Sequence, residues 1–258
     1  MTPLPFPAGG EVHVRLFSLD RNDCELAHFE SCLTPDERER ADRYLNGCVR
    51  DRFVAGRGFL RKTLSCYLGI PPDMIVLALE EQGKPFLADA ALSARLQFNL
   101  SHTGGEAILA VAGNCRVGVD LERVREKLAY REIARRFFST REQEDLFSLS
   151  PSGQLDAFFR CWTRKEAYIK GCGTGFSQPA DGFAVSLRPG EPPALLEHQT
   201  IADEPLRWRL ADLPVPDGYR AALALEGAAP IVRYFPADPA RILPPNHNTI
   251  SNKPRFVE

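Results

Sequence analysis

Two acidic residues near the end of a short apolar segment have the type and spacing of a metal site. Asp120 and Glu122 lie in a predicted strand that covers residues 117–122. Residues two apart in a strand point to the same face, so the carboxylates should lie side by side, with Val119 and Leu121 facing the core. Adjacent carboxylates repel unless a cation or proton lies between them, and oxygen ligands suit Mg²⁺. The spacing is compatible with a magnesium site, but by itself it favours the alternative, an exposed strand end with two ordinary acids.

A third acid lies farther along the chain, on a predicted helix. Glu166 and Lys170 are one turn apart and share a helix face with Trp162. Beside a phosphate they would act as an acid–base couple. Otherwise they form a common ion pair worth roughly 0.2–0.5 kcal/mol. Considered alone, this helix favours the ordinary ion pair; the aromatic residue on the same face indicates partial burial, which weakens that interpretation slightly.

Two further segments carry groups that could bind a phosphate. Residues 99–105 end a predicted strand, and their backbone amides, the Ser101 hydroxyl and the His102 imidazole could hold a phosphate. A histidine at a strand end is also a common structural hydrogen-bonding residue. Residues 83–85, which include Lys84 and Pro85, form by themselves only a turn that carries a lysine.

Composition limits the classes of protein to which the chain belongs. Of its 258 residues 44% are hydrophobic and 26% charged, values typical of a soluble globular protein. This length allows one large domain or two domains of roughly 100–130 residues each. The net charge of −2 provides no overall field for nucleic acid or an anionic membrane, so any anion site must be local.

The cysteines and the N-terminus favour a cytoplasmic protein. The seven cysteines are odd in number and none is spaced as C-x-x-C, a pattern that argues against a disulfide framework or a zinc site. No basic start followed by an apolar run predicts a signal peptide, and the apolar stretches are too short to span a bilayer. We therefore expect reduced thiols and no membrane association.

The sequence predicts blocks of helices separated by short strands, and these elements must position the candidate site residues. Thr34 with Glu37, and Ser139 with Glu142, have the spacing of capping boxes that begin helices. Residues 151–153 should break the second of these helices before a further helix begins. The predicted helices are 35–45, 48–68, 130–138, 140–149 and 154–170, and the predicted strands are 11–19, 75–80, 96–100, 107–112, 117–122, 183–187, 206–210 and 219–225. This pattern predicts an α+β fold.

Taken in order, these segments resemble the 4′-phosphopantetheinyl transferases, in particular the larger surfactin-synthetase-activating type. The resemblance covers roughly residues 30–225, and each motif is weak by itself, whereas the ordered set is specific. The matching segments are Gly83-Lys84-Pro85, Asn99-Leu100-Ser101-His102, Gly118-Val119-Asp120-Leu121-Glu122, Trp162-Thr163-Arg164-Lys165-Glu166-Ala167-Tyr168-Ile169-Lys170 and Gly173-x-Gly175, with supporting likeness at Thr34-Pro35 and Arg57-Gly58-Phe59-Leu60-Arg61.

The resemblance also implies an architecture. It implies two similar α/β halves related by a pseudo-twofold axis, with the active site in the cleft between them. The N-terminal half would be residues 1–114, with the contacts to the coenzyme A nucleotide and phosphates. The C-terminal half would be 115–227, with the metal and catalytic carboxylates. Residues 228–258, rich in proline and asparagine, would form an extended tail.

The implied reaction is transfer of 4′-phosphopantetheine from coenzyme A to a serine of an apo acyl or peptidyl carrier protein, with release of adenosine 3′,5′-bisphosphate. By resemblance Asp120, Glu122 and Glu166 hold Mg²⁺, Glu166 is also the general base, and Lys170 stabilises the departing phosphate. The residues that would contact coenzyme A are Lys84, Pro85, Ser101, His102, Arg40 and Arg52. Glu37 stands where the family often has a basic residue, so other residues must also bind the 3′-phosphate of coenzyme A.

The partner and the pathway are predicted less directly. A basic cluster follows the acidic strand, and it is either a solvated, salt-bridged helix face or a docking surface for an acidic carrier protein. Its members are Arg123, Arg125, Lys127, Arg131, Arg135 and Arg136. The longer type of this family tends to be promiscuous, which favours polyketide or nonribosomal peptide pathways by analogy. Two halves that complete one cleft favour a monomer.

Two other functions compete with this one. A magnesium-dependent hydrolase of nucleotide pyrophosphates would use the same carboxylates and release phosphopantetheine to water. A non-catalytic carrier-binding subunit would keep the fold without the chemistry, and the presence of all of Asp120, Glu122, Glu166 and Lys170 argues against it.

Overall fold

The computed structural model describes residues 4–81, 83–175 and 178–235. The helices are α1 (Asp23–Ser31), α2 (Pro35–Asp42), α3 (Gly47–Leu68), α4 (Ala90–Arg95), α5 (Tyr130–Phe137), α6 (Thr140–Ser148), α7 (Pro151–Cys172) and α8 (Glu204–Arg207). The strands are β1 (Glu11–Ser18), β2 (Leu77–Leu79), β3 (Pro85–Leu87), β4 (Leu96–Thr103), β5 (Glu106–Gly113), β6 (Val117–Arg123), β7 (Phe183–Val185), β8 (Leu195–His198), β9 (Trp208–Asp212), β10 (Tyr219–Glu226) and β11 (Ile231–Tyr234). The predicted α+β class is confirmed.

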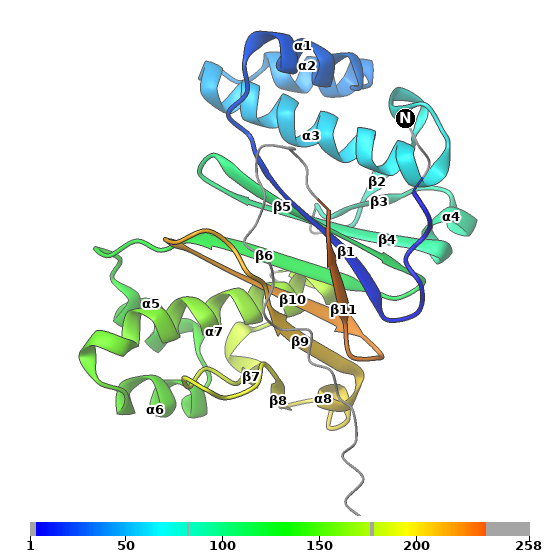
Figure 1. The fold of residues 1–258 in the computed structure, drawn as a ribbon. Helices are drawn as coiled ribbons and strands as arrows, with labels where there is room; N and C mark the ends of the chain where they lie inside the picture. Colours follow the sequence, from blue (N-terminus) through cyan, green and yellow to red (C-terminus); the bar gives the residue numbers. More distant parts are fainter. Residues whose placement is uncertain (1–3, 82, 176–177, 236–258) are drawn as a thin grey trace, which may run out of the picture.

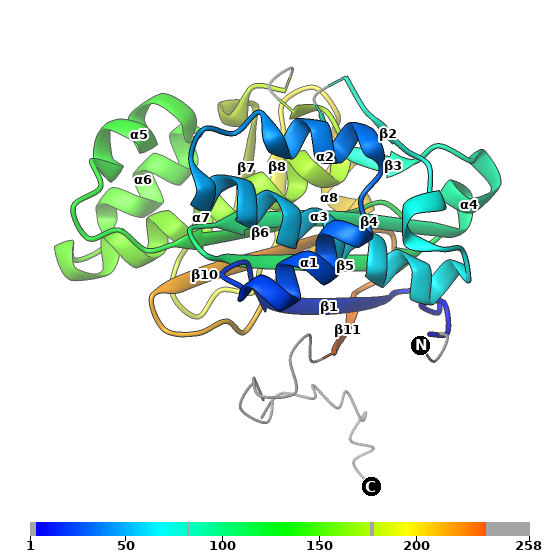
Figure 2. The same cartoon turned by 90° about the horizontal axis from the view of Figure 1, so that it is seen from above.

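The molecule is built from four layers, with two sheets between two sets of helices (Figure 1). One sheet has the order β11-β1-β5-β4 and carries α3 on its outer face; the other has the order β6-β10-β9 and carries α7. The inner faces meet in an apolar core that includes Val14, Ala110, Val119 and Leu223. Figure 2 shows α1 and α2 on the same side of the first sheet as α3, and α5 and α6 at one end of the molecule.

The two long helices that cover the sheets have well-defined ends. Asn46 caps α3 by accepting a hydrogen bond from the Val49 amide, and Gly69 ends it with a φ of 67°. α7 begins at Pro151, so the predicted break between the two helices exists but lies at residues 149–150 rather than 151–153. Proline is tolerated in the first helical turn, where its missing N–H would have had no helical partner. α7 ends at Gly173, which has a φ of 72°.

A close approach of backbones holds α7 against β6. A Cβ on Gly118 would lie 2.0 Å from the Ala167 carbonyl oxygen and 2.3 Å from the Gly171 nitrogen. Only glycine therefore permits this contact between strand and helix. The contact brings residues 120 and 122 of the strand alongside residues 166 and 170 of the helix.

The segment after residue 227 is only partly as predicted. Instead of a uniformly extended tail, Ile231–Tyr234 form β11, which pairs in parallel with β1 and returns the chain to the first sheet. Residues 236–258, the rest of the predicted tail, lie outside the described residues. The division of the chain into domains at 114 and 227 stays a prediction.

No helix within the described residues combines the length and apolar character that a bilayer crossing requires.

Candidate active site

Asp120 is the centre of a buried polar cluster. Its side chain, only 3% exposed, faces α7 from β6. Its Oδ1 atom accepts hydrogen bonds from Lys170 Nζ at 2.5 Å and from Ser101 Oγ at 3.0 Å, and Lys170 Nζ lies 2.9 Å from that hydroxyl. The other oxygen, Oδ2, is buried and has no hydrogen-bond partner among the described residues. A buried carboxylate oxygen in this state is available to a cation.

The other two predicted acids are close enough to Asp120 to feel its charge. Burial first, and then the charge of Asp120, raise the pKa of Glu166, while Lys170 lowers it. Burial and the charge of Asp120 also raise the pKa of Glu122, and the charge of Glu166 raises it further. The nearby cations Arg125 and Lys170 lower this pKa in part. The strand and the helix thus bring the three acids close enough for their charges to interact.

The donor chemistry fits a hard divalent cation, although the side chains are not assembled around one. Three mutually repelling carboxylates and a free buried oxygen are features that an ion such as Mg²⁺ would neutralise. However, no group of three or more histidine, cysteine, aspartate or glutamate residues within 4–81, 83–175 and 178–235 is arranged to hold a metal ion.

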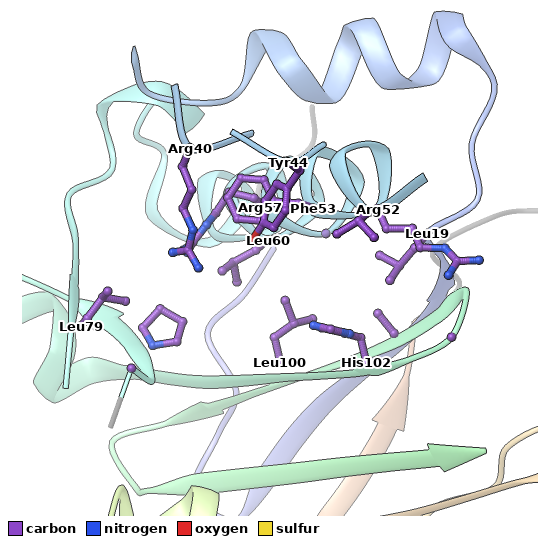
Figure 3. Close-up of a pocket in the computed structure, with 16 residues that line it drawn as sticks. Leu19, Arg40, Tyr44, Arg52, Phe53, Arg57, Leu60, Leu79, Leu100 and His102 are labelled. Atoms are coloured by element: carbon purple, nitrogen blue, oxygen red, sulfur yellow. The ribbon is translucent and has the colours of Figure 1, made fainter. Parts of the chain in front are cut away.

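A cavity of about 500 Å³ lies next to this cluster, between α3 and β4. Arg40, Arg57 and Phe53 from the helices, and Leu100 and His102 from β4, point into a common space (Figure 3). Burial, and then the charge of Lys170, lower the pKa of His102. His102 also directly follows Ser101, whose hydroxyl donates to Asp120, so the imidazole is near the acidic cluster. The cavity therefore lies beside the predicted chemistry.

Four of the six residues predicted to contact coenzyme A line the cavity. They are Arg40, Arg52, Pro85 and His102. Ser101 is not among the lining residues, because neighbours in a strand point to opposite faces and its hydroxyl is turned toward Asp120. Lys84 is also outside the lining. Its Nζ donates to the Lys170 carbonyl at 2.8 Å and to the Val117 carbonyl at 3.4 Å, which ties the turn to the ends of α7 and β6.

One cavity residue was missed by the sequence analysis. Arg57 lines the cavity, and its Nε lies 3.2 Å from Glu37 Oε1. Burial lowers the pKa of Arg57, and the positive charges of Arg61 and Arg40 lower it further. The negative charge of Glu37 raises this pKa and so opposes them. Two guanidinium groups facing one cavity are typical of an anion site. The only signal in the sequence was the likeness of residues 57–61 to the family.

Glu37, which stands where the family resemblance implied a basic residue, has a structural role. It completes the capping box of α2 by accepting from the Thr34 amide at 3.2 Å. It also accepts hydrogen bonds from Arg61 at 2.5 and 2.9 Å and pairs with Arg57. Its carboxylate therefore orients one of the arginines of the cavity.

Comparison with known proteins shows the family to which the chain is similar. The family model described as the 4′-phosphopantetheinyl transferase superfamily matches residues 116–224, and the 4′-phosphopantetheinyl transferase N-terminal model matches residues 20–114. The chain is 38% identical over 217 residues to the 4′-phosphopantetheinyl transferase HetI of Nostoc sp. (strain PCC 7120), covering 84% of this chain and 88% of that protein. It is 33% identical over 163 residues to the 4′-phosphopantetheinyl transferase Sfp of Bacillus subtilis (strain 168), covering 63% and 70%.

The matching family models and relatives are group-transferring enzymes. The chain belongs to the 4′-phosphopantetheinyl transferase family, and the resemblance inferred from the ordered motifs is confirmed. It is a transferase that acts on coenzyme A and carrier proteins. The pyrophosphate hydrolase alternative has no support in these matches.

Proposed function

We propose that this chain transfers 4′-phosphopantetheine to a serine of an apo acyl or peptidyl carrier protein, with the nucleotide of coenzyme A in the cavity between α3 and β4. The observation that carries the proposal is the position of this cavity beside the cluster of Asp120 and Lys170. A nucleotide bound there would extend its diphosphate past His102 toward the acids.

The proposed metal ligands are Asp120, Glu122 and Glu166, with Mg²⁺ as the ion. A bound Mg²⁺ would offset the charge of the diphosphate and favour in-line displacement. The free Oδ2 of Asp120 and the raised pKa values of the two glutamates support this assignment.

The remaining chemistry belongs to the side chains of this chain. The carrier serine oxygen forms a bond to the β-phosphorus, and the bond from that phosphorus to the bridging oxygen breaks. The electron pair of the broken bond stays on the bridging oxygen, which leaves as part of adenosine 3′,5′-bisphosphate. Glu166 receives the serine proton, directly or through water. Lys170 stabilises the charge of the departing phosphate and donates a proton to it when needed.

A direct assay tests the proposed function. The protein is incubated with coenzyme A, Mg²⁺ and an apo carrier protein, and the carrier is weighed by mass spectrometry. Transfer adds the mass of one phosphopantetheine to the carrier, and a chelator abolishes this gain. Consumption of coenzyme A with an unchanged carrier would instead indicate hydrolysis.

Arg57 and Arg40 are proposed to hold the 3′-phosphate of coenzyme A, in place of the basic residue that Glu37 replaces. We expect Arg57→Ala to raise KM for coenzyme A about 10- to 100-fold with little change in kcat, since a charge-assisted hydrogen bond contributes about 1.5–3 kcal/mol. The measurement is steady-state kinetics with coenzyme A and with 3′-dephospho-coenzyme A. The variant should lose the preference for coenzyme A; a preference equal to that of the wild type would place the 3′-phosphate elsewhere.

The basic cluster after β6 is proposed to dock the acidic surface of the carrier. Arg135 and Arg136 are exposed on α5, where their guanidinium groups stack 5.5 Å from the Phe147 ring centroid and 5.1 Å from that of Phe137. Stacking holds both cations in place without neutralising them. We expect the double charge reversal Arg135→Glu and Arg136→Glu to raise KM for the carrier at low salt, and this effect should shrink as salt screens the charges. An unchanged KM at low salt would remove α5 from the docking surface.

Three finer properties are proposed from the family resemblance and the cysteine pattern. These are a monomeric state, a cytoplasmic location and carriers of polyketide or nonribosomal peptide synthesis. Size-exclusion chromatography tests the first, and a panel of apo carriers weighed after modification tests the last.

A further inference from the structure

Two polar side chains of β4 take the place of a strand partner for β6. β4 and β6 are edge strands of different sheets, and β6 pairs with β10 along its other edge. On the edge of β6 that faces away from β10, the Val119 amide donates to Asn99 Oδ1 at 2.8 Å. The Leu121 amide on the same edge donates to Ser101 Oγ at 3.3 Å. Both side chains are 4% exposed. We call these two hydrogen bonds the β4–β6 seam.

The two hydrogen bonds of the β4–β6 seam lie on either side of Asp120 in the sequence. The two anchored amides belong to the residues immediately before and after Asp120, so the backbone on each side of the carboxylate is fixed to β4. Buried amides without such acceptors would cost about 1–3 kcal/mol each. The backbone position of Asp120 in the C-terminal sheet therefore depends on the side chains of a strand in the N-terminal sheet.

The hydrogen bonds of the Ser101 hydroxyl are complete. A serine hydroxyl has one proton to donate and two lone pairs. Its proton goes to Asp120 Oδ1, and its lone pairs accept from the Leu121 amide and Lys170 Nζ. No capacity remains for a phosphate oxygen of coenzyme A. Ser101 and Lys170 both act on Oδ1, and this leaves Oδ2 as the unpartnered atom.

We infer that Asn99 and Ser101 are positioning residues, which fix β6 against β4 and turn Asp120 so that its Oδ2 is presented to the metal. The inference rests on the proposed metal role of Asp120. It assigns Ser101 a different task from the phosphate contact that the family resemblance implied. It also makes the nucleotide half and the metal half mechanically dependent on each other, because His102 follows Ser101 on the same strand and lines the cavity.

The test uses the full chain and three variants, Ser101→Ala, Asn99→Ala and Gln97→Ala. Gln97 lies on the same face of β4, but its amide group donates to Ser93 and not to β6, so it is the matched control. Three quantities are measured: amide hydrogen exchange by NMR without metal or coenzyme A, Mg²⁺ affinity of the free protein by calorimetry, and KM for coenzyme A at saturating Mg²⁺.

We expect Ser101→Ala to speed exchange at the Leu121 amide and Asn99→Ala to speed exchange at Val119. Both should weaken Mg²⁺ binding, about 10-fold or more for Ser101→Ala, the size typical of residues that orient metal ligands. KM for coenzyme A should change less than about twofold, and Gln97→Ala should resemble the wild type. Raised KM with unchanged exchange and metal affinity would overturn the inference and restore the phosphate contact. If the wild type bound no Mg²⁺, the proposed metal role would fail, while the exchange rates would still decide whether the seam exists in solution.

Discussion

Replacement of Glu166 by glutamine should lower kcat for carrier modification by about 10³-fold and leave the fold intact. General-base catalysis contributes about 10²- to 10⁴-fold, and glutamine can neither accept the serine proton nor bring a negative charge to a cation. Glu166 is half-buried next to Asp120, and both facts raise its pKa. Since the ionised side chain is unfavourable there, the neutral glutamine should not lower the melting temperature. Single-turnover formation of holo carrier, followed by mass spectrometry, measures the effect.

The matched control is the same substitution on an exposed helix position, Glu144→Gln on α6, which should keep the wild-type rate. A second comparison is Asp120→Asn combined with Glu166→Gln. If the two acids act as one unit, the double variant should be scarcely slower than the worse single variant. Undiminished turnover in Glu166→Gln would refute its role as base and ligand.

Local features of the fold could be predicted from the sequence because their physical causes are local. The capping boxes at Thr34 and Ser139 are both formed, and each satisfies amides within its own first turn. The period of two along 117–123 correctly predicted that Asp120 and Glu122 lie opposite the apolar residues. In contrast, β11 consists of four residues that are a strand only because β1 offers a free edge.

The candidate site was harder to predict where the partners of a side chain are distant in the sequence. The orientation of Ser101 is set by Asp120 and Lys170, which lie 19 and 69 residues away. Lys84 bonds to carbonyls 33 and 86 residues away. Arg57 is held by Glu37 from another helix. No periodicity encodes such contacts, so the sequence could name the residue types at the site but not the atoms that each one touches.

The second large effect is expected at Glu142, which is not among the residues predicted to act in the reaction. Its carboxylate is fully buried and accepts hydrogen bonds from Lys165 Nζ at 2.7 Å for both oxygens, and from the amides of Ser139 and Val185 at 2.8 Å each. Lys165, 2% exposed, also donates to the Phe183 carbonyl at 2.7 Å. This cluster joins α6, α7 and β7. Because Lys165 precedes Glu166 on α7, we expect its contacts also to help to orient Glu166.

We expect Glu142→Ala to lower the free energy of unfolding by about 3–5 kcal/mol, because it leaves the Lys165 ammonium buried without its counter-ion. Urea denaturation measures this loss. The control on the same helix is Asp145→Ala, which breaks a more exposed pair with Arg188 and should cost no more than about 1 kcal/mol.

The double variant Glu142→Leu with Lys165→Met distinguishes a buried charge from a loss of packing. It removes both charges and keeps most of the buried volume, so it should be more stable than Glu142→Ala. Equal destabilisation in Glu142→Ala and Asp145→Ala would show that the pair is hydrated in solution. In that case the orientation of Glu166 would have to depend on the contact between Gly118 and Gly171 rather than on the charge pair.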